Sequence, residues 1–129
     1  MFFSVVIPLY NKAYSIQRCI DSVLNQSYTN FEIIVINDGS IDNSVQILKS
    51  LYKDQLEAKK ILVIEQKNQG VSVARNVGIS NSKSNYICFL DADDEWKRDF
   101  LFKISRLISD FPEASMYCLA HEVSKNNSI

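Results

Sequence analysis

The sequence predicts an α/β fold with a doubly wound, mostly parallel β-sheet and helices on both faces. Three observations support this prediction. Strand-like and helix-like patterns alternate along the chain, with short connections between them. The strand-like runs are apolar at nearly every position, as is typical of parallel strands that helices bury on both faces. Polar residues directly follow several of these runs, which is where ligands bind in sheets of this class.

The first half of the chain predicts two strands, each followed by a helix. Residues 2–7 form a β-prone run that Pro8 closes, since proline has no N–H to donate to a strand ladder. Residues 31–36 form the second apolar run, and the turn residues 37–40 end it. The helix after each strand shows a single apolar stripe, made of Ile16, Ile20, Val23 and Leu24 in the first helix and of Ile41, Val45, Leu48 and Tyr52 in the second.

The second half repeats this order of strands and helices. The expected strands are residues 61–64, 86–90 and 116–120, and the expected helices are residues 71–79 and 100–111. His121 is expected to be partly buried at the end of the fifth strand, which would form an edge of the sheet. Residues 125–129 are polar and are expected to fray.

The composition is that of one globular domain, residues 1–129. The formal net charge is −1, and 47% of the residues are hydrophobic, which are ordinary values for a soluble protein. No basic stripe points to nucleic acid, and no apolar run approaches the roughly 18 residues that cross a bilayer. The N-terminus does not resemble a signal peptide. We therefore expect a cytoplasmic protein without a membrane segment in this chain.

The cysteines and the histidine limit the chemistry that the chain can perform. Cys19, Cys88 and Cys118 are odd in number, widely spaced and placed in apolar segments. We expect reduced core thiols, not disulfides or a zinc site. His121 is the only histidine, so a serine–histidine relay or a histidine pair has little support.

The acidic run after the fourth strand is the most informative local feature. While the backbone stays extended, Asp91 and Asp93 point to the same side. Two carboxylates about 4 Å apart repel by about 1 kcal/mol in water and about 4 kcal/mol near a protein surface, so a cation usually offsets the repulsion. Oxygen-only ligands favour Mg²⁺ or Mn²⁺. The alternative is a solvated acidic turn, and Asp94 and Glu95 are expected to start the next segment without binding metal.

Two further polar clusters follow the first and second strands, at Tyr10-Asn11 and at Asp38. The carboxyl ends of parallel strands share one edge of the sheet, so these clusters and the acidic run are expected to meet there. Tyr10 can stack on a planar base, and Asn11 and Asp38 can form hydrogen bonds with a base or sugar. Equally, Pro8 and Asn11 can form a plain turn into the helix, and Asp38 can belong to a capping loop.

Arg75 and Trp96 complete the candidate residues near this edge. Arg75 lies about one turn inside a short helix, as a fixed cation suited to phosphate or carboxylate. It can equally pair with an acidic residue of the same edge. Trp96 is expected to pack as a wedge beneath the acidic loop.

Four segments occur in the order and spacing of a known family. They are residues 4–11 (SVVIPLYN), 32–40 (EIIVINDGS), 68–78 (NQG through ARNVG) and 89–94 (FLDADD). Together they resemble the nucleotide-binding half of the family 2 glycosyltransferases, which have the Rossmann-like GT-A fold. The resemblance covers residues 2–108. Each segment is weak alone, but four in register are specific.

The resemblance implies a nucleotide-sugar donor, most often a uridine diphosphate sugar, and a divalent cation, Mn²⁺ or Mg²⁺. By position, Tyr10 would lie against the base and Asp38 would bond its edge. Arg75 would flank the base and the diphosphate. Asp91 would face the ribose, and Asp93 would hold the metal. The expected donor-binding set is Pro8, Tyr10, Asn11, Asp38, Arg75, Asp91 and Asp93, with Asp93 and Asp91 as metal ligands.

The chain departs from the family pattern in two places. Asn37 stands where relatives often have aspartate. The family's catalytic base and acceptor-binding segment follow well after the acidic motif, and no carboxylate between Glu95 and Glu122 occupies the expected place. We therefore expect a truncated GT-A fold that binds the donor, without an assigned catalytic residue and inactive by itself. The complete enzyme is expected to be an inverting hexosyltransferase of polysaccharide biosynthesis, with a saccharide or lipid-linked acceptor at the inner membrane face.

Two other function classes share parts of this pattern. A signalling receiver module has this length and Mg²⁺-binding aspartates, but it needs an acidic pair after the first strand, where this chain has Pro8-Leu9-Tyr10, and a basic residue after the fifth. A nucleotide-binding module without catalysis is the second alternative. An incomplete sheet leaves an apolar edge, so a homo-oligomer is also expected.

Overall fold

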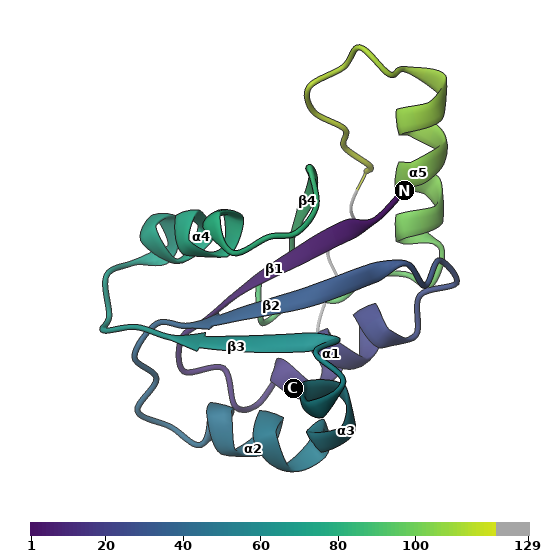
Figure 1. Ribbon diagram of the computed structural model, residues 1–129. Helices are drawn as coiled ribbons and strands as arrows, with labels where there is room; N and C mark the ends of the chain where they lie inside the picture. The colour runs from purple at the N-terminus through teal and green to yellow at the C-terminus, as the bar shows by residue number, and fades with distance from the viewer. Residues whose placement is uncertain (121–129) are drawn as a thin grey trace, which may run out of the picture.

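The computed structural model describes residues 1–120 and shows a four-stranded sheet with helices on both faces (Figure 1). Along the chain the elements are β1 (Phe3–Leu9), α1 (Ile16–Leu24), β2 (Phe31–Asn37), α2 (Ser44–Leu51), α3 (Lys53–Glu57), β3 (Ile61–Glu65), α4 (Val71–Ser80), β4 (Tyr86–Phe89) and α5 (Phe100–Asp110). The strand order is β3-β2-β1-β4, and all three pairings are parallel. The predicted fold class is confirmed.

The central strand β2 has a nearly continuous apolar sequence because helices cover both of its faces. β2 is buried along its whole length, and its side chains alternate between the two faces. Ile33 and Val35 join the larger core cluster, whereas Ile34 and Ile36 pack with Ala74 of α4 on the other face. In Figure 1, α4 lies above the sheet and α1, α2 and α3 lie below it. Helices α1, α2 and α5 contribute Ile20, Leu48 and Leu101 to the larger cluster.

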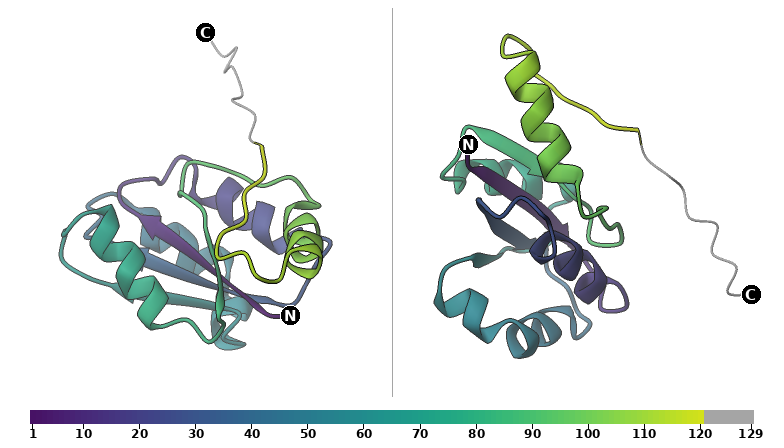
Figure 2. Two further views of the ribbon diagram at one scale, coloured as in Figure 1. Left: turned by 90° about the horizontal axis from the view of Figure 1, so that it is seen from above. Right: turned by 90° about the vertical axis from the view of Figure 1, so that its right-hand side faces the viewer.

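Helix α5 lies near the N-terminal end of β1, at the end of the sheet where the strands begin (Figure 2). The loops after the strands therefore lie at the opposite end. Within the described residues, no helix is long and apolar enough to span a lipid bilayer.

Several local predictions were wrong. Pro8 does not close the first strand, because β1 continues to Leu9 and Pro8 stands opposite Ile36 in the ladder. Residues 116–120 have no regular secondary structure: a strand needs a hydrogen-bonded neighbour, and Tyr117 and Leu119 instead pack partly against the core. Ile41 lies outside α2 and is 89% exposed, because the chain between β2 and Ser44 forms a loop held by side-chain hydrogen bonds. Cys118 is exposed and is not a core thiol. The predictions for His121 and residues 125–129 lie outside the described residues.

The other two cysteines fit the core interpretation. Cys19 is buried and Cys88 is partly buried, and both are free thiols. Burial raises the pKa of the Cys88 thiol to about 12. Burial also raises the pKa of Cys19 to about 12, with the negative charges of Asp94, Asp91 and Asp93 acting in the same direction. Both groups therefore stay protonated at neutral pH.

Strand β4 leaves part of its apolar surface exposed. It pairs with β1 alone among the described strands. Tyr86 and Phe89 on it are 40% and 45% exposed. Self-association through this edge stays a prediction, since such edges pair readily with further strands.

Gly78 allows α4 to pack closely on the sheet. A Cβ at this position would lie 2.3 Å from Cγ1 of Val6, a fully buried residue of β1. We expect Gly78→Ala to lower the free energy of unfolding by about 2 kcal/mol, because α4 must shift or Val6 must leave its rotamer. Urea denaturation measures the change, with Ser80→Ala on the exposed side of α4 as the control. Adding Val6→Ala should recover part of the loss, and an unchanged midpoint for Gly78→Ala would contradict this packing.

Candidate functional site

The loops that follow the four strands meet at one edge of the sheet and line a cleft of about 420 Å³. The lining residues are Pro8, Leu9, Tyr10, Lys12, Asp38, Asn68, Gly70, Val71, Ala74, Arg75, Asp91, Ala92 and Asp93. Six of the seven predicted site residues are among them, and Asn11 is the exception. The structure thus brings these residues together, while the ligand that each contacts stays a prediction.

Asp38 is buried at the base of this cleft and holds the loop after β3. Its Oδ1 accepts hydrogen bonds from Gln66 Nε2 and the Gln69 N–H, both at 2.8 Å, and its Oδ2 accepts one from the Gly70 N–H at 3.1 Å. Burial alone would raise the pKa of this carboxyl, but these three hydrogen bonds outweigh it and lower the pKa. Asp38 therefore stays ionised, with one lone pair of Oδ2 left for a ligand.

Asn11 joins two loops instead of lining the cleft. It has a positive φ of 51°, and its Oδ1 accepts hydrogen bonds from the Ile41 N–H at 2.8 Å and the Asp42 N–H at 3.4 Å. Asp42 accepts in turn from the Ala13 N–H at 3.0 Å. These bonds fasten the loop after β1 to the loop after β2. Asn11 thus has a structural role in these loops, and its contact with a base or sugar stays a prediction.

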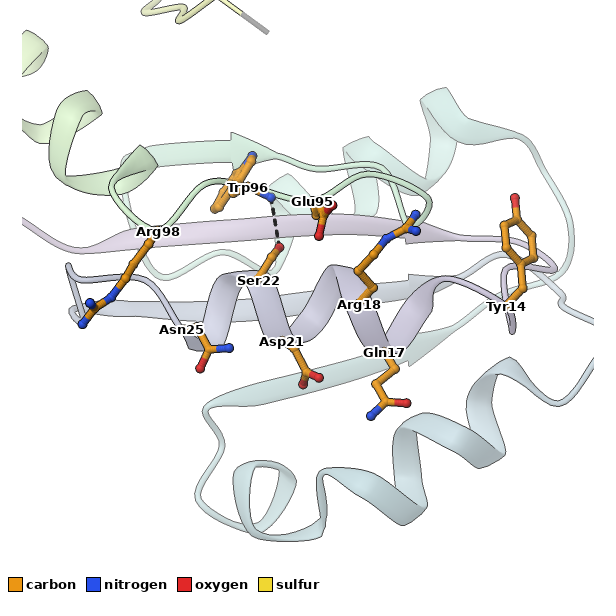
Figure 3. Close-up of a pocket in the computed structure, with 9 residues that line it drawn as sticks. All are labelled: Tyr14, Gln17, Arg18, Asp21, Ser22, Asn25, Glu95, Trp96 and Arg98. Atoms are coloured by element: carbon orange, nitrogen blue, oxygen red, sulfur yellow. Dashed lines mark hydrogen bonds between the residues drawn. The ribbon is translucent and has the colours of Figure 1, made fainter. Parts of the chain in front are cut away.

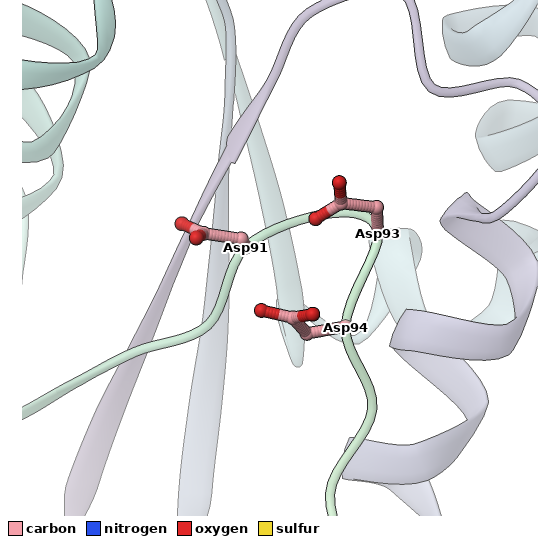
Figure 4. A group of neighbouring side chains, drawn as sticks. All are labelled: Asp91, Asp93 and Asp94. Atoms are coloured by element: carbon pink, nitrogen blue, oxygen red, sulfur yellow. The ribbon is translucent and has the colours of Figure 1, made fainter. Parts of the chain in front are cut away.

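The acidic run forms a turn, so the extended backbone assumed for Asp91 and Asp93 is wrong. The Asp94 N–H donates to the Asp91 carbonyl at 3.0 Å, which closes the turn directly after β4. In this turn, one carboxylate oxygen from each of Asp91, Asp93 and Asp94 lies within 4.8 Å of the other two (Figure 4). Asp94, which we expected only to start the next segment, therefore belongs to the group.

Two cations lie beside these carboxylates. Arg75 Nη2 is 3.1 Å from Asp91 Oδ1, and Lys12 Nζ is 3.9 Å from Asp93 Oδ2. All four side chains are at least one-third exposed, so these ion pairs contribute little to stability. They do place positive charge on both sides of the acidic turn.

Arg75 takes the structural role that its position suggested, and its contact with a phosphate stays a prediction. It pairs with Asp91, and its Nε is buried without a hydrogen-bond partner among the described residues. Its guanidinium also lies 5.9 Å from the ring centre of Phe89. Tyr10, at the rim of the same cleft, is 45% exposed and offers a free aromatic face.

The donor atoms of the acidic turn suit a hard divalent cation. They are carboxylate oxygens alone, the ligand type that Mg²⁺ and Mn²⁺ prefer. All three carboxylates are exposed, which leaves room for water and for oxygens of a ligand to complete the coordination shell. The residues present therefore fit such an ion.

A second hollow, of about 540 Å³, lies on the other side of the acidic turn, between α1 and the segment after Asp94 (Figure 3). It contains none of the predicted site residues. Its lining mixes Arg18 and Arg98 with Asp21 and Glu95, so it has no strong charge of one sign. Trp96, expected as a wedge, borders this hollow and stacks on Phe100 with ring centres 4.3 Å apart.

Sequence reasoning missed Lys12, Asp94 and Gln66. Lys12 directly follows the Tyr10-Asn11 cluster, so a cation opposite the acidic run was visible in the sequence. Asp94 was visible but was assigned to the next segment. Gln66 follows β3 at the same edge of the sheet, and nothing in the sequence alone pairs it with Asp38.

Comparison with known proteins adds a family to this geometry. The sequence model of the family described as "Glycosyl transferase family 2" matches residues 4–128. Glycosyltransferase GlyA of Streptococcus pneumoniae serotype 4 is 39% identical over 108 residues. This match covers 84% of the chain but 15% of GlyA, so the chain spans a small part of that relative's length.

Solved structures show the same arrangement of elements. S. aureus TarS 1–349 in complex with UDP superposes with a TM-score of 0.77 at 27% identity, covering 87% of this chain and 33% of that one. The mannosyltransferase PcManGT from Pyrobaculum calidifontis, in complex with GDP-Man and Mn²⁺, superposes with a TM-score of 0.76 at 22% identity, covering 84% and 32%. The second similarity is one of fold alone.

Proposed function

This chain belongs to glycosyl transferase family 2, and we propose that its part in the reaction is to bind a nucleoside diphosphate sugar through a divalent cation. The observation that carries the proposal is the single cleft shared by the acidic turn, Arg75 and the aromatic side chain of Tyr10. An anionic diphosphate needs positive charge next to a base-binding surface, and this cleft offers both. Family membership also removes support from the signalling receiver alternative.

The base and the ribose of the nucleotide are assigned to different side chains of the cleft. Tyr10 supplies the exposed aromatic face on which the base stacks, and the remaining lone pair of Asp38 Oδ2 accepts from the base edge. Asp91 faces the ribose. The complex of TarS with UDP supports a uridine nucleotide, because the aligned part of TarS is 27% identical to this chain and covers 87% of it.

The acidic turn is assigned to the cation. Asp93 is the main ligand, with Asp91 and Asp94 beside it. The bound ion would supply Lewis-acid stabilisation of the charge that builds on the departing diphosphate. Lys12 and Arg75 act on the same charge from either side of the turn, and they also hold the carboxylates that they pair with. The carboxylate ligands favour hard, oxygen-binding ions, and both Mn²⁺ and Mg²⁺ belong to this class.

The reaction of the whole protein is part of the same proposal. We assign transfer of the sugar, with inversion, to a hydroxyl of a saccharide or lipid-linked acceptor, in the cytoplasm or at the inner membrane face. A general base takes the proton of that hydroxyl as it attacks the anomeric carbon. None of the seven residues predicted for the site is given this role.

Calorimetric titration of UDP tests the proposal. With saturating Mn²⁺ we expect binding, and with EDTA we expect an affinity lower by about 10-fold or more, since a bound ion would add attraction for the diphosphate. GDP serves as the comparison for the base and should bind more weakly. Absence of binding of either nucleotide in the presence of Mn²⁺ would refute the proposal, and equal affinity with EDTA would refute its metal.

A further inference from the structure

Ser15 makes an unusual use of its hydroxyl group. It stands at the N-cap position of α1, where a serine usually accepts a hydrogen bond from an N–H in the first turn of its own helix. It makes no such bond. Its Oγ instead donates to the carbonyl oxygen of Ala92 at 2.9 Å, 77 residues along the chain. Both residues are buried, with 1% and 2% of their surface exposed. The Ser15 hydroxyl therefore binds the centre of the acidic turn and does not cap α1.

The same face of α1 binds the rest of the turn. Arg18 Nη2 donates to the Asp93 carbonyl at 3.0 Å, and Cys19 Sγ donates to the Asp91 carbonyl at 3.5 Å. Together with Ser15, these side chains bind three successive carbonyls of the acidic turn. One helical turn further on, Ser22 Oγ accepts from the Trp96 N–H at 3.1 Å (Figure 3). Residues three, four and seven apart lie on one side of a helix, so this polar stripe faces the loop as a unit.

The turn needs such an anchor because its own side chains oppose it. Three carboxylates with oxygens within 4.8 Å of one another repel, and Arg75 and Lys12 offset only part of this repulsion from their exposed positions. Within the turn, the Asp94 N–H donates a hydrogen bond to the Asp91 carbonyl. Fixing the Ala92 carbonyl also fixes the buried Ala92 side chain, so the flanking side chains of Asp91 and Asp93 are directed outward. The buried bond from Ser15 is the part of the anchor that water cannot replace.

We propose that Ser15 is a positioning residue for the cation site: its hydrogen bond to Ala92 holds the carboxylates of Asp91, Asp93 and Asp94 together before the ion binds. Arg18 and Cys19 assist from the same helix. The proposal rests on the proposed function for the identity of the ligand. Groups that fix metal ligands in place typically change metal affinity by 10-fold or more when they are removed.

The test compares Ser15→Ala with Ser22→Ala in the whole chain. Both remove a serine hydroxyl that α1 uses to hold the 91–101 segment, but Ser22 binds it beyond the acidic turn. Mn²⁺ affinity is measured by electron paramagnetic resonance of the free ion, and hydrogen exchange of the Asp94 N–H reports the turn without metal. Ser15→Ala should weaken Mn²⁺ binding about 10-fold and speed this exchange. Ser22→Ala should lower the melting temperature about as much as Ser15→Ala does, but should leave the Mn²⁺ affinity and the Asp94 N–H exchange unchanged. Ser15→Thr should restore the Mn²⁺ affinity and the slow exchange of the parent.

The outcomes separate this inference from the proposed function. If the parent chain binds no Mn²⁺, the metal part of the proposed function fails, and the exchange of the Asp94 N–H alone decides whether Ser15 positions the turn. If Ser15→Ala leaves both the Mn²⁺ affinity and this exchange unchanged, Ser15 has no positioning role. If Ser22→Ala weakens Mn²⁺ binding as much as Ser15→Ala does, the effect is one of general stability and the inference is overturned.

Discussion

Replacing Asp93 with alanine is expected to remove the Mn²⁺-dependent part of UDP binding and to leave the fold intact. The Asp93 carboxylate is exposed, and its ion pair with Lys12 is long at 3.9 Å, so its loss should change the free energy of unfolding by less than about 0.5 kcal/mol. The proposed role of Asp93 as the main ligand of the cation predicts that Asp93→Ala lowers the UDP affinity measured with Mn²⁺ about 100-fold, or by about 2.7 kcal/mol. Calorimetry with Mn²⁺ and with EDTA measures both parts.

Two further variants sharpen this test. Asp99→Ala removes an exposed carboxylate paired with Lys103 at 3.1 Å, outside the cleft, and should leave UDP binding unchanged. Asp94→Ala tests whether the third carboxylate of the turn is also a ligand of the cation. The structure groups Asp94 with Asp91 and Asp93, whereas the sequence pattern assigned it to the next segment. An Asp93→Ala protein that keeps the affinity of the parent in Mn²⁺ would show that the cation does not bind at this turn.

The meeting of the polar loops at one edge was predictable, whereas the shape of the acidic turn was not. Parallel strands fix where their carboxyl ends lie, so apolar runs followed by Tyr10, Asp38 and Asp91 were enough to place these residues together. The turn depends on hydrogen bonds from α1, above all the one from Ser15 to Ala92. Such a bond between residues 77 positions apart leaves no periodic signal in the sequence.

The same distinction explains the failure at residues 116–120 and the success with β2. The β2 run is apolar except for Glu32 and Asn37 and has partner strands on both sides, so local pattern and tertiary environment agree. Residues 116–120 are also apolar, but Met116 is 78% exposed and none of the strands among residues 1–120 pairs with the segment. Composition predicts a preference for strand, and only pairing turns that preference into structure.

Asp38→Ala is expected to lower the free energy of unfolding by about 3 kcal/mol. The buried carboxylate accepts three hydrogen bonds from the loop after β3, and its removal leaves the N–H groups of Gln69 and Gly70 without their acceptor. Asp38→Asn should cost about half as much, because the amide oxygen keeps the bonds to Oδ1 while the NH₂ group opposes the Gly70 N–H. Asp110→Ala, at the exposed C-terminal end of α5, is the control and should cost nothing measurable.

The pH dependence of stability gives Asp38 a second, independent test. Its pKa in the folded chain lies below its ordinary value of 3.8, so the unfolded chain takes up this proton first as the pH falls. The stabilisation is therefore complete above about pH 5 and is lost as the pH drops below about 4. Hydrogen bonds from Ser44 and Ala13 outweigh burial and lower the pKa of Asp42 in the same way, so Asp38→Asn should flatten the acid limb of a urea-midpoint profile without abolishing it. If the profile of Asp38→Asn ran parallel to that of the parent, the three hydrogen bonds to Asp38 would not persist in solution.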